Sequence, residues 1–243
     1  MSASTGTGSR VDLIAGLRRV AAALAAGALA GWLIGGVGGR IAMLVLRLTS
    51  DPMLHGMQSD DGFTIGIVSS STLFLLVATT VLGAIGGLVY LGVRSWLPER
   101  LRPWIFGMLA GLVGGSRVIR PGGVDFTLLD PLALALAMFV ALPAAYGAAT
   151  SLLAERFLRE DSAFRGSRAS FALLVFLLPI ALSGPTGVLV LLAIAAAVAV
   201  VWMRPSLAGI WTSGPVTWLG RAALLVVGIQ ASVELARDVT TVL

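Results

Sequence analysis

The chain has 243 residues, of which 57% are hydrophobic and only 12% are charged, and its mean hydropathy is +0.96. A soluble domain carries about 25% charged residues, so this composition excludes an ordinary soluble protein and predicts one that crosses a membrane several times. All 17 basic residues are arginine. They flank apolar stretches instead of forming a basic stripe, which excludes nucleic-acid binding despite a pI near 11.2.

The residue types that are missing exclude several kinds of chemistry. Without lysine, the chain has no Schiff-base lysine, no Walker-type phosphate-binding lysine and no attachment point for retinal. Without cysteine, it has no disulfides, no thiol catalysis and no cysteine-ligated metal. A single histidine, His55, excludes His-rich zinc centres, bis-His haem and most Ser-His hydrolases. We therefore expect no cofactor.

Apolar stretches long enough to cross a bilayer predict an all-α fold, a polytopic transmembrane helical bundle of about seven spans. Residues 1–19 are predicted to form a short cytoplasmic tail, and residues 20–243 a single transmembrane domain. The short stretches at 169–203 are either two spans or one re-entrant hairpin, and either arrangement returns the chain to the same side. The predicted spans are 20–46, 64–91, 103–119, 131–153, 169–183, 186–203 and 216–238.

The distribution of arginine and tryptophan predicts the orientation of these spans. With the N-terminus in the cytoplasm and the C-terminus outside, 12 arginines fall on the inner side and 5 on the outer side, as the positive-inside rule requires. Use of arginine alone, together with abundant alanine and glycine, is typical of a GC-rich bacterial genome, so we expect a bacterial inner-membrane protein. The tryptophans at predicted inner boundaries are Trp96, Trp104, Trp202, Trp211 and Trp218.

Two segments of the chain share a glycine pattern. Residues 31–40, GWLIGGVGGR, match residues 107–117, GMLAGLVGGSR, at six positions, and an arginine follows each copy. The match predicts a duplicated helical hairpin, with copies at 20–102 and 103–168, followed by a C-terminal three-span segment at 169–243. The alternative is coincidence between two glycine-rich helices. Parallel repeats of this kind occur in transporters, but that analogy concerns the fold alone.

Small residues recur along one face of several predicted helices. Such faces let helix backbones approach closely within the bundle, and they also offer a surface for homo-oligomers. In the first and third spans they are Gly27, Gly31 and Gly35, and Gly107 and Gly111. In the second span the face carries hydroxyls as well, and it is predicted to be a packing seam, with the wall of a polar cavity as the alternative. Its members are Ser69, Thr72, Thr79, Gly83 and Gly86.

The arginines that end the two glycine segments are the main candidates for function. Arg117 lies 13 residues beyond Trp104, about 20 Å along a helix, which places it in the outer leaflet. An uncompensated arginine in hydrocarbon costs at least a few kcal/mol near the bilayer centre, so we expect acids, an anion or snorkelling to satisfy it. Asp130 precedes a proline and is predicted mainly to cap a helix. The predicted outer-leaflet site comprises Arg40, Arg117, Arg120, Asp60, Asp61, Asp125 and Glu234.

Other site types have weaker support. Met53, His55 and Met57 form an M-x-H-x-M sequence whose soft ligands suit Cu(I), but methionines are common in loops and we expect no metal site. Ser116 in the GGSR segment has no accompanying base, so it is not predicted to be a nucleophile.

Three hypotheses about function remain. The first is a transporter-like protein, or one that binds an anionic small molecule or lipid head group at the outer-leaflet arginines. The second is a non-catalytic structural or partner-binding membrane protein, whose arginines form internal salt bridges. The third is a membrane-embedded enzyme that acts on lipid at the outer face. Membrane lipids are the expected partners in each case.

Overall fold

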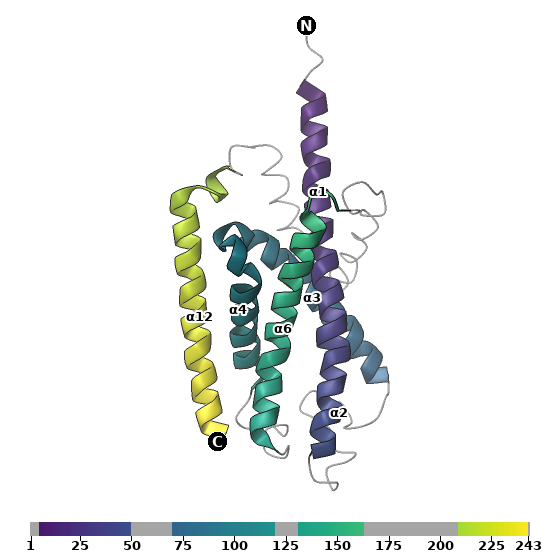
Figure 1. The fold of residues 1–243 in the computed structure, drawn as a ribbon, viewed down its shortest axis with the longest axis vertical. Helices are drawn as coiled ribbons and strands as arrows, with labels where there is room; N and C mark the ends of the chain where they lie inside the picture. Colours follow the sequence, from purple (N-terminus) through teal and green to yellow (C-terminus); the bar gives the residue numbers. More distant parts are fainter. Residues whose placement is uncertain (1–4, 50–69, 120–130, 163–208, 243) are drawn as a thin grey trace.

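The computed structural model describes residues 5–49, 70–119, 131–162 and 209–242, which form helices and short turns with no strand among them. Helix α1 is continued without a break by the π-helix η1 and by α2, and two short 3-10 turns, η3 and η4, connect α3 to α4 (Figure 1). The elements are α1 Thr5–Ala30, η1 Gly31–Gly38, α2 Gly39–Thr49, α3 Ser70–Val93, η3 Arg94–Trp96, η4 Glu99–Leu101, α4 Arg102–Val118, α6 Leu132–Leu158 and α12 Gly214–Val242.

Four helical stretches in the described part of the chain are long and apolar enough to cross a membrane. They are Ile14–Thr49, Leu73–Trp96, Leu132–Leu158 and Gly214–Val242. These four stretches agree with the predicted all-α class and with predicted membrane spans. Helix α4 has 17 residues, or about 25 Å of rise, and coincides with the predicted span at 103–119. The predicted spans at 169–183 and 186–203 lie outside the described residues, so the count of about seven stays a prediction.

The helices lie side by side along the long axis of the molecule and alternate in direction (Figure 1). Helix α1 packs against α3 and α6, α6 packs against α4, and α12 covers the far side of α4. The N-terminal part of α1 extends beyond the other helices, and the start of α1 and the end of α12 lie at opposite ends of the bundle (Figure 1). Five helical segments therefore run alternately along one axis, as helices that cross a membrane do.

Glycines bring α1 and α3 into backbone contact. A Cβ atom on Gly27 would collide with the carbonyl oxygen of Gly83, and one on Gly31 would lie 2.9 Å from the Gly83 Cα. Alanines of α1, which favour helix and are small, are buried on either side of this contact. With no side chains between them, the two helices gain dispersion contacts along the whole seam.

Helices α4 and α6 meet in the same way. A Cβ on Gly107 would lie 2.9 Å from the carbonyl oxygen of Ala144, and one on Gly147 would lie 3.0 Å from the Gly107 Cα. At Gly111 the nearest atom would be the Ala144 Cβ, at 2.8 Å. The prediction that the glycine faces of the first and third spans allow close helix approach is confirmed.

The π-helix η1 interrupts the first membrane-length helix and ends two residues before Arg40. Four of its eight residues are glycine, whose permissive backbone tolerates the wider turn. Gly36 is buried, and a Cβ there would lie 2.6 Å from the Leu76 side chain of α3. On the facing helix, Thr79 donates its hydroxyl to the carbonyl of Leu75 at 2.8 Å, as expected of a packing seam.

Candidate functional site

The structure describes three members of the predicted outer-leaflet site. Arg40 lies at the second position of α2 and is partly buried, Arg117 is exposed near the end of α4, and Glu234 is exposed on α12. Helix α2, the last turns of α4 and the C-terminal part of α12, which carry these residues, lie toward the same end of the bundle (Figure 1). Among the described residues, no ion pair joins Arg117 to Glu234. The other predicted residues lie outside the described part: Arg120, Asp60, Asp61, Asp125 and Asp130, and Met53, His55 and Met57.

Contacts between side chains show which helix ends lie close together. Leu46 of α2 packs against Ala135 near the start of α6, and Ile119 after α4 packs with Leu136 and Leu235. The ends of α2 and α4, the start of α6 and the C-terminal part of α12 therefore lie together. We call this the Arg40/Arg117 end.

A polar cluster centred on Glu155 occupies the opposite end of the bundle. Arg94 donates from Nε to Oε1 of Glu155 at 2.6 Å and from Nη2 to Oε2 at 2.8 Å, the bidentate arrangement that makes arginine–carboxylate pairs strong. The hydroxyl of Tyr90 donates to the same Oε1 at 2.6 Å. The carboxylate thus joins the end of α3 to the end of α6.

Arg102, the first residue of α4, is the third donor side chain in this cluster. Its Nη1 donates to Oε1 of Glu155 at 3.3 Å, and its side chain is only 10% exposed. Its Nη2 also lies 3.5 Å from Glu99, but the carboxylate of Glu99 is 84% exposed, so this contact contributes little. Two guanidinium groups therefore share one partly buried carboxylate. We call Tyr90, Arg94, Arg102 and Glu155 the Glu155 cluster.

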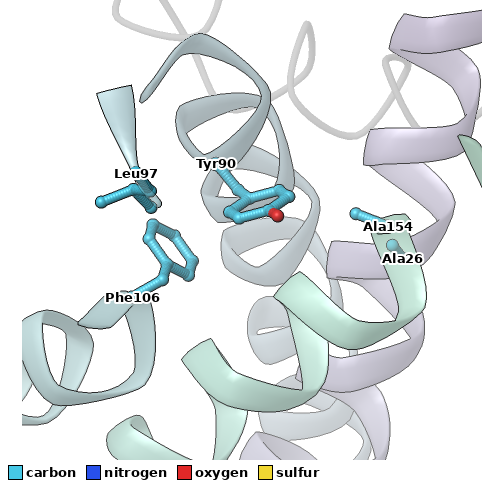
Figure 2. Close-up of a cluster of buried hydrophobic side chains, with 5 residues drawn as sticks. All are labelled: Ala26, Tyr90, Leu97, Phe106 and Ala154. Atoms are coloured by element: carbon cyan, nitrogen blue, oxygen red, sulfur yellow. The ribbon is translucent and has the colours of Figure 1, made fainter. Parts of the chain in front are cut away.

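An apolar layer lies directly against the Glu155 cluster. Figure 2 shows Tyr90 and Phe106 facing each other, with their ring centroids 5.0 Å apart in an edge-to-face arrangement. Ala26, Leu97 and Ala154 complete this layer, so α1, α3, the α3–α4 connection, α4 and α6 all contribute to it. Because the layer keeps water away from one side of the cluster, the attraction between Glu155 and its arginines is stronger than it is in bulk water.

Tryptophans attach α12 to the same end of the bundle. Trp211 packs against Trp96 with centroids 4.9 Å apart and donates from Nε1 to the carbonyl of Gly92 at 3.0 Å. Arg221 donates to the carbonyl of Trp96 at 2.9 Å and lies over the ring of Trp218. Three predicted boundary tryptophans thus gather where α12 begins, whereas Trp202 lies outside the described residues.

The Glu155 cluster is not among the sites that the sequence predicts. Arg94 and Arg102 belong to the 12 arginines assigned to the inner side, and no role is predicted for Glu155. A usable signal was present, since an acidic residue in an otherwise apolar helix requires a partner. The identity of that partner could not be read from the chain, because Tyr90 and Glu155 are 65 positions apart.

Comparison of the chain with protein families, with curated proteins and with solved structures finds no match in any of the three. The fold and the Glu155 cluster define the class of protein: an all-helical bundle with membrane-length helices, glycine seams and an ion-paired cluster at one end. Within the described ranges, no group of three or more histidines and acids is placed to hold a metal ion.

Proposed function

We propose that this protein is a transporter-like or ligand-binding protein of the bacterial inner membrane that holds an anionic group at its Arg40/Arg117 end. The anion would be a carboxylate, a phosphate or a lipid head group. The proposal includes about seven spans, a cytoplasmic N-terminus and an extracytoplasmic C-terminus. The observation that carries it is that the arginines following the two glycine segments, Arg40 and Arg117, lie at the same end of the bundle, and that Arg117 is exposed there.

The side chain of Arg117 supports an anion at this end. Arg117 is exposed, so its guanidinium can reach a solute or a lipid head group. Each guanidinium offers five donors in a planar fork that matches carboxylate and phosphate oxygens.

The helix geometry before Arg40 gives further support. The π-helix η1 ends at Gly38, two residues before that arginine, and π-helical turns occur frequently at functional sites. A widened turn changes the direction in which the next side chains point. We infer that η1 directs Arg40 toward the anion.

We also propose that the hairpins at 20–102 and 103–168 are copies of one ancestral unit. In each copy the glycines of the first helix contact the second helix: Gly27 and Gly31 meet α3, and Gly107 and Gly111 meet α6. In each copy an arginine then follows at the same end. A duplicated unit of this kind supports the transporter-like architecture, by analogy of fold alone.

The test is to identify what the protein carries when it is purified with its native lipid. Native mass spectrometry of the unsubstituted protein should show a bound anion or acidic lipid, and Arg117→Leu or the double variant Arg40→Leu/Arg117→Leu should lose it. Arg159→Leu is the matched control, because Arg159 is exposed at the opposite end. If the double variant keeps the bound species, the anion site is not where we place it.

A structural, partner-binding role is the second candidate function, and the Glu155 cluster favours it. There, two arginines in the described bundle pair with an acid of the same chain and hold helices together. If Arg40 and Arg117 act in the same way toward other acids of the chain, Arg117→Leu should lower thermal stability in detergent. Substituting its acidic partner as well should restore part of that stability.

A further inference from the structure

The described helices fall into two rigid pairs. Within each pair, α1 with α3 and α4 with α6, backbones touch through glycine, and a Cβ at Gly83 or Gly107 would meet backbone atoms of the partner helix. Such seams have little freedom to slide, since any shift brings backbone against backbone. Each pair is therefore packed more closely than the two pairs are packed against each other.

Contacts between the two pairs are made by side chains. The hydroxyl of Tyr146 on α6 donates to the carbonyl of Gly83 on α3 at 2.8 Å. Ala26 of α1 and Ala154 of α6 meet in the apolar layer, and Glu155 accepts from Tyr90 and Arg94. Side-chain contacts of this kind have alternative arrangements, and they are where packed bodies move relative to each other.

The chain connects the two pairs through a short segment that has the form of a hinge. Between α3 and α4 lie the two 3-10 turns η3 and η4, separated by Leu97 and Pro98 in extended conformation, with ψ angles of 135° and 130°. A few such residues at the ends of elements can absorb the change in backbone angles that a rigid-body motion requires.

Glu155 bridges this hinge. Arg94 is the first residue after α3 and Arg102 is the first residue of α4, so the two arginines lie at the two ends of the connecting segment, and both bind the same carboxylate. While both contacts exist, the segment between them cannot extend.

We propose that the Glu155 cluster is a latch that holds the hinge between the α1–α3 pair and the α4–α6 pair closed. When the carboxylate releases its arginines, the two pairs separate at this end and the interior beside Glu155 becomes accessible to water. The α1–α3 seam stays closed, because glycine contacts and the buried Leu24, Ala28 and Ala84 hold it without Glu155. This inference does not depend on the anion site at the other end of the bundle.

The absence of cysteine from the chain allows a direct test with single reporter thiols. Ser151→Cys places one thiol a turn before Glu155, at a fully buried position. Ala84→Cys places one in the α1–α3 layer, also fully buried. Each reporter is combined with Glu155→Gln, and alkylation by a hydrophilic maleimide is followed by intact mass in detergent micelles.

The matched control is Glu99→Gln. This variant removes the exposed acid that also contacts Arg102 and leaves Glu155 in place. In the Glu155→Gln background we expect the thiol at position 151 to react at least about tenfold faster, the thiol at 84 to react as before, and neither to respond to Glu99→Gln. Arg94→Gln is a second, milder way to open the latch, and it should give the same pattern if Glu155→Gln does not fold.

Three outcomes would overturn the proposal. In the first, the thiol at position 151 reacts rapidly even when Glu155 is present, so the hinge is not closed. In the second, the alkylation rate of the thiol at 151 is the same in both latch variants as in the protein with Glu155, so the carboxylate does not hold the hinge. In the third, the thiols at 151 and 84 both react faster, so the substitution loosens the whole bundle.

Discussion

The environment of Glu155 explains how a carboxylate is retained near the end of an apolar helix. Removing a charge from water costs several kcal/mol unless partners replace the lost hydration. Here Tyr90, Arg94 and Arg102 supply four hydrogen bonds to its two oxygens. The carboxylate in turn holds Arg102, which is nine-tenths buried. Neither charge is favourable without the other, so the cluster is expected to form or break as a unit.

At this scale we predict that Tyr90→Phe is more costly than Tyr146→Phe. Both changes remove one interhelical hydrogen bond and keep the ring, but Tyr90 donates to a carboxylate and Tyr146 to a neutral carbonyl. The free energy of unfolding should fall by about 1.5–3 kcal/mol for Tyr90→Phe and by about 0.5–1.5 kcal/mol for Tyr146→Phe. Denaturant unfolding in detergent, followed by circular dichroism, measures both. Equal losses would mean that Tyr90 does not stabilise the charge of Glu155.

At the scale of the element, the glycines decide which helices pair. Hydrophobicity does not select a partner inside a bilayer, because lipid chains are as apolar as leucine. Close approach of two backbones does select a partner. Only glycine permits it at positions 27 and 83, because a Cβ on either residue would meet the carbonyl oxygen of the other. The arrangement of α1 against α3 therefore follows from the spacing of these residues.

We predict that Gly83→Ala destabilises the bundle and that Gly92→Ala does not. A Cβ at Gly83 meets the Gly27 carbonyl and lies 2.8 Å from the Gly31 Cα, so overpacking should cost about 1–3 kcal/mol. No atom lies within 4 Å of a Cβ at Gly92 on the same helix, and there alanine should stabilise the helix by roughly 0.5–1 kcal/mol. Thermal unfolding of the two variants, measured side by side, tests this. A neutral Gly83→Ala would mean that the seam is looser than described.

Features of the element scale can be predicted from this sequence, whereas the residue cluster around Glu155 cannot. The helices and the glycine faces were predictable, because apolar length and four-residue spacing are local properties of the chain. The Glu155 cluster was not, because its members come from α3, η3, α4 and α6 and meet only after the helices have paired. The predicted outer-leaflet site rests on the same kind of non-local contact, and most of its acids lie outside the described residues.

At the scale of the whole molecule, the direction of each helix constrains the topology. Ala26 of α1 lies near Ala154 of α6, and Leu46 of α2 lies near Ala135, so these helices run in opposite directions. Arg221 of α12 contacts Trp96, just before α4, and Leu235 lies near Gly115 in α4. The described helices therefore alternate in direction, with α4 and α12 running the same way. The end of α6 and the start of α12 then lie at the same end of the bundle (Figure 1). That arrangement agrees with the predicted return of residues 169–203 to the side from which they start, either as two spans or as a hairpin.

Reporter fusions along the chain test this topology together with its predicted orientation. Fusions after residues 98 and 162 should report the cytoplasm, and fusions after residues 56, 125 and 243 the periplasm, because 12 of the 17 arginines then lie inside. The fusions test the alternation of the helices and their orientation in the membrane independently. If all five signals are inverted, the alternation of the helices stands and the orientation is wrong. If residues 162 and 243 report the same side, α12 does not run from the Glu155 end to the Arg40/Arg117 end across the membrane. The two ends of the bundle would then not correspond to the two faces of the membrane.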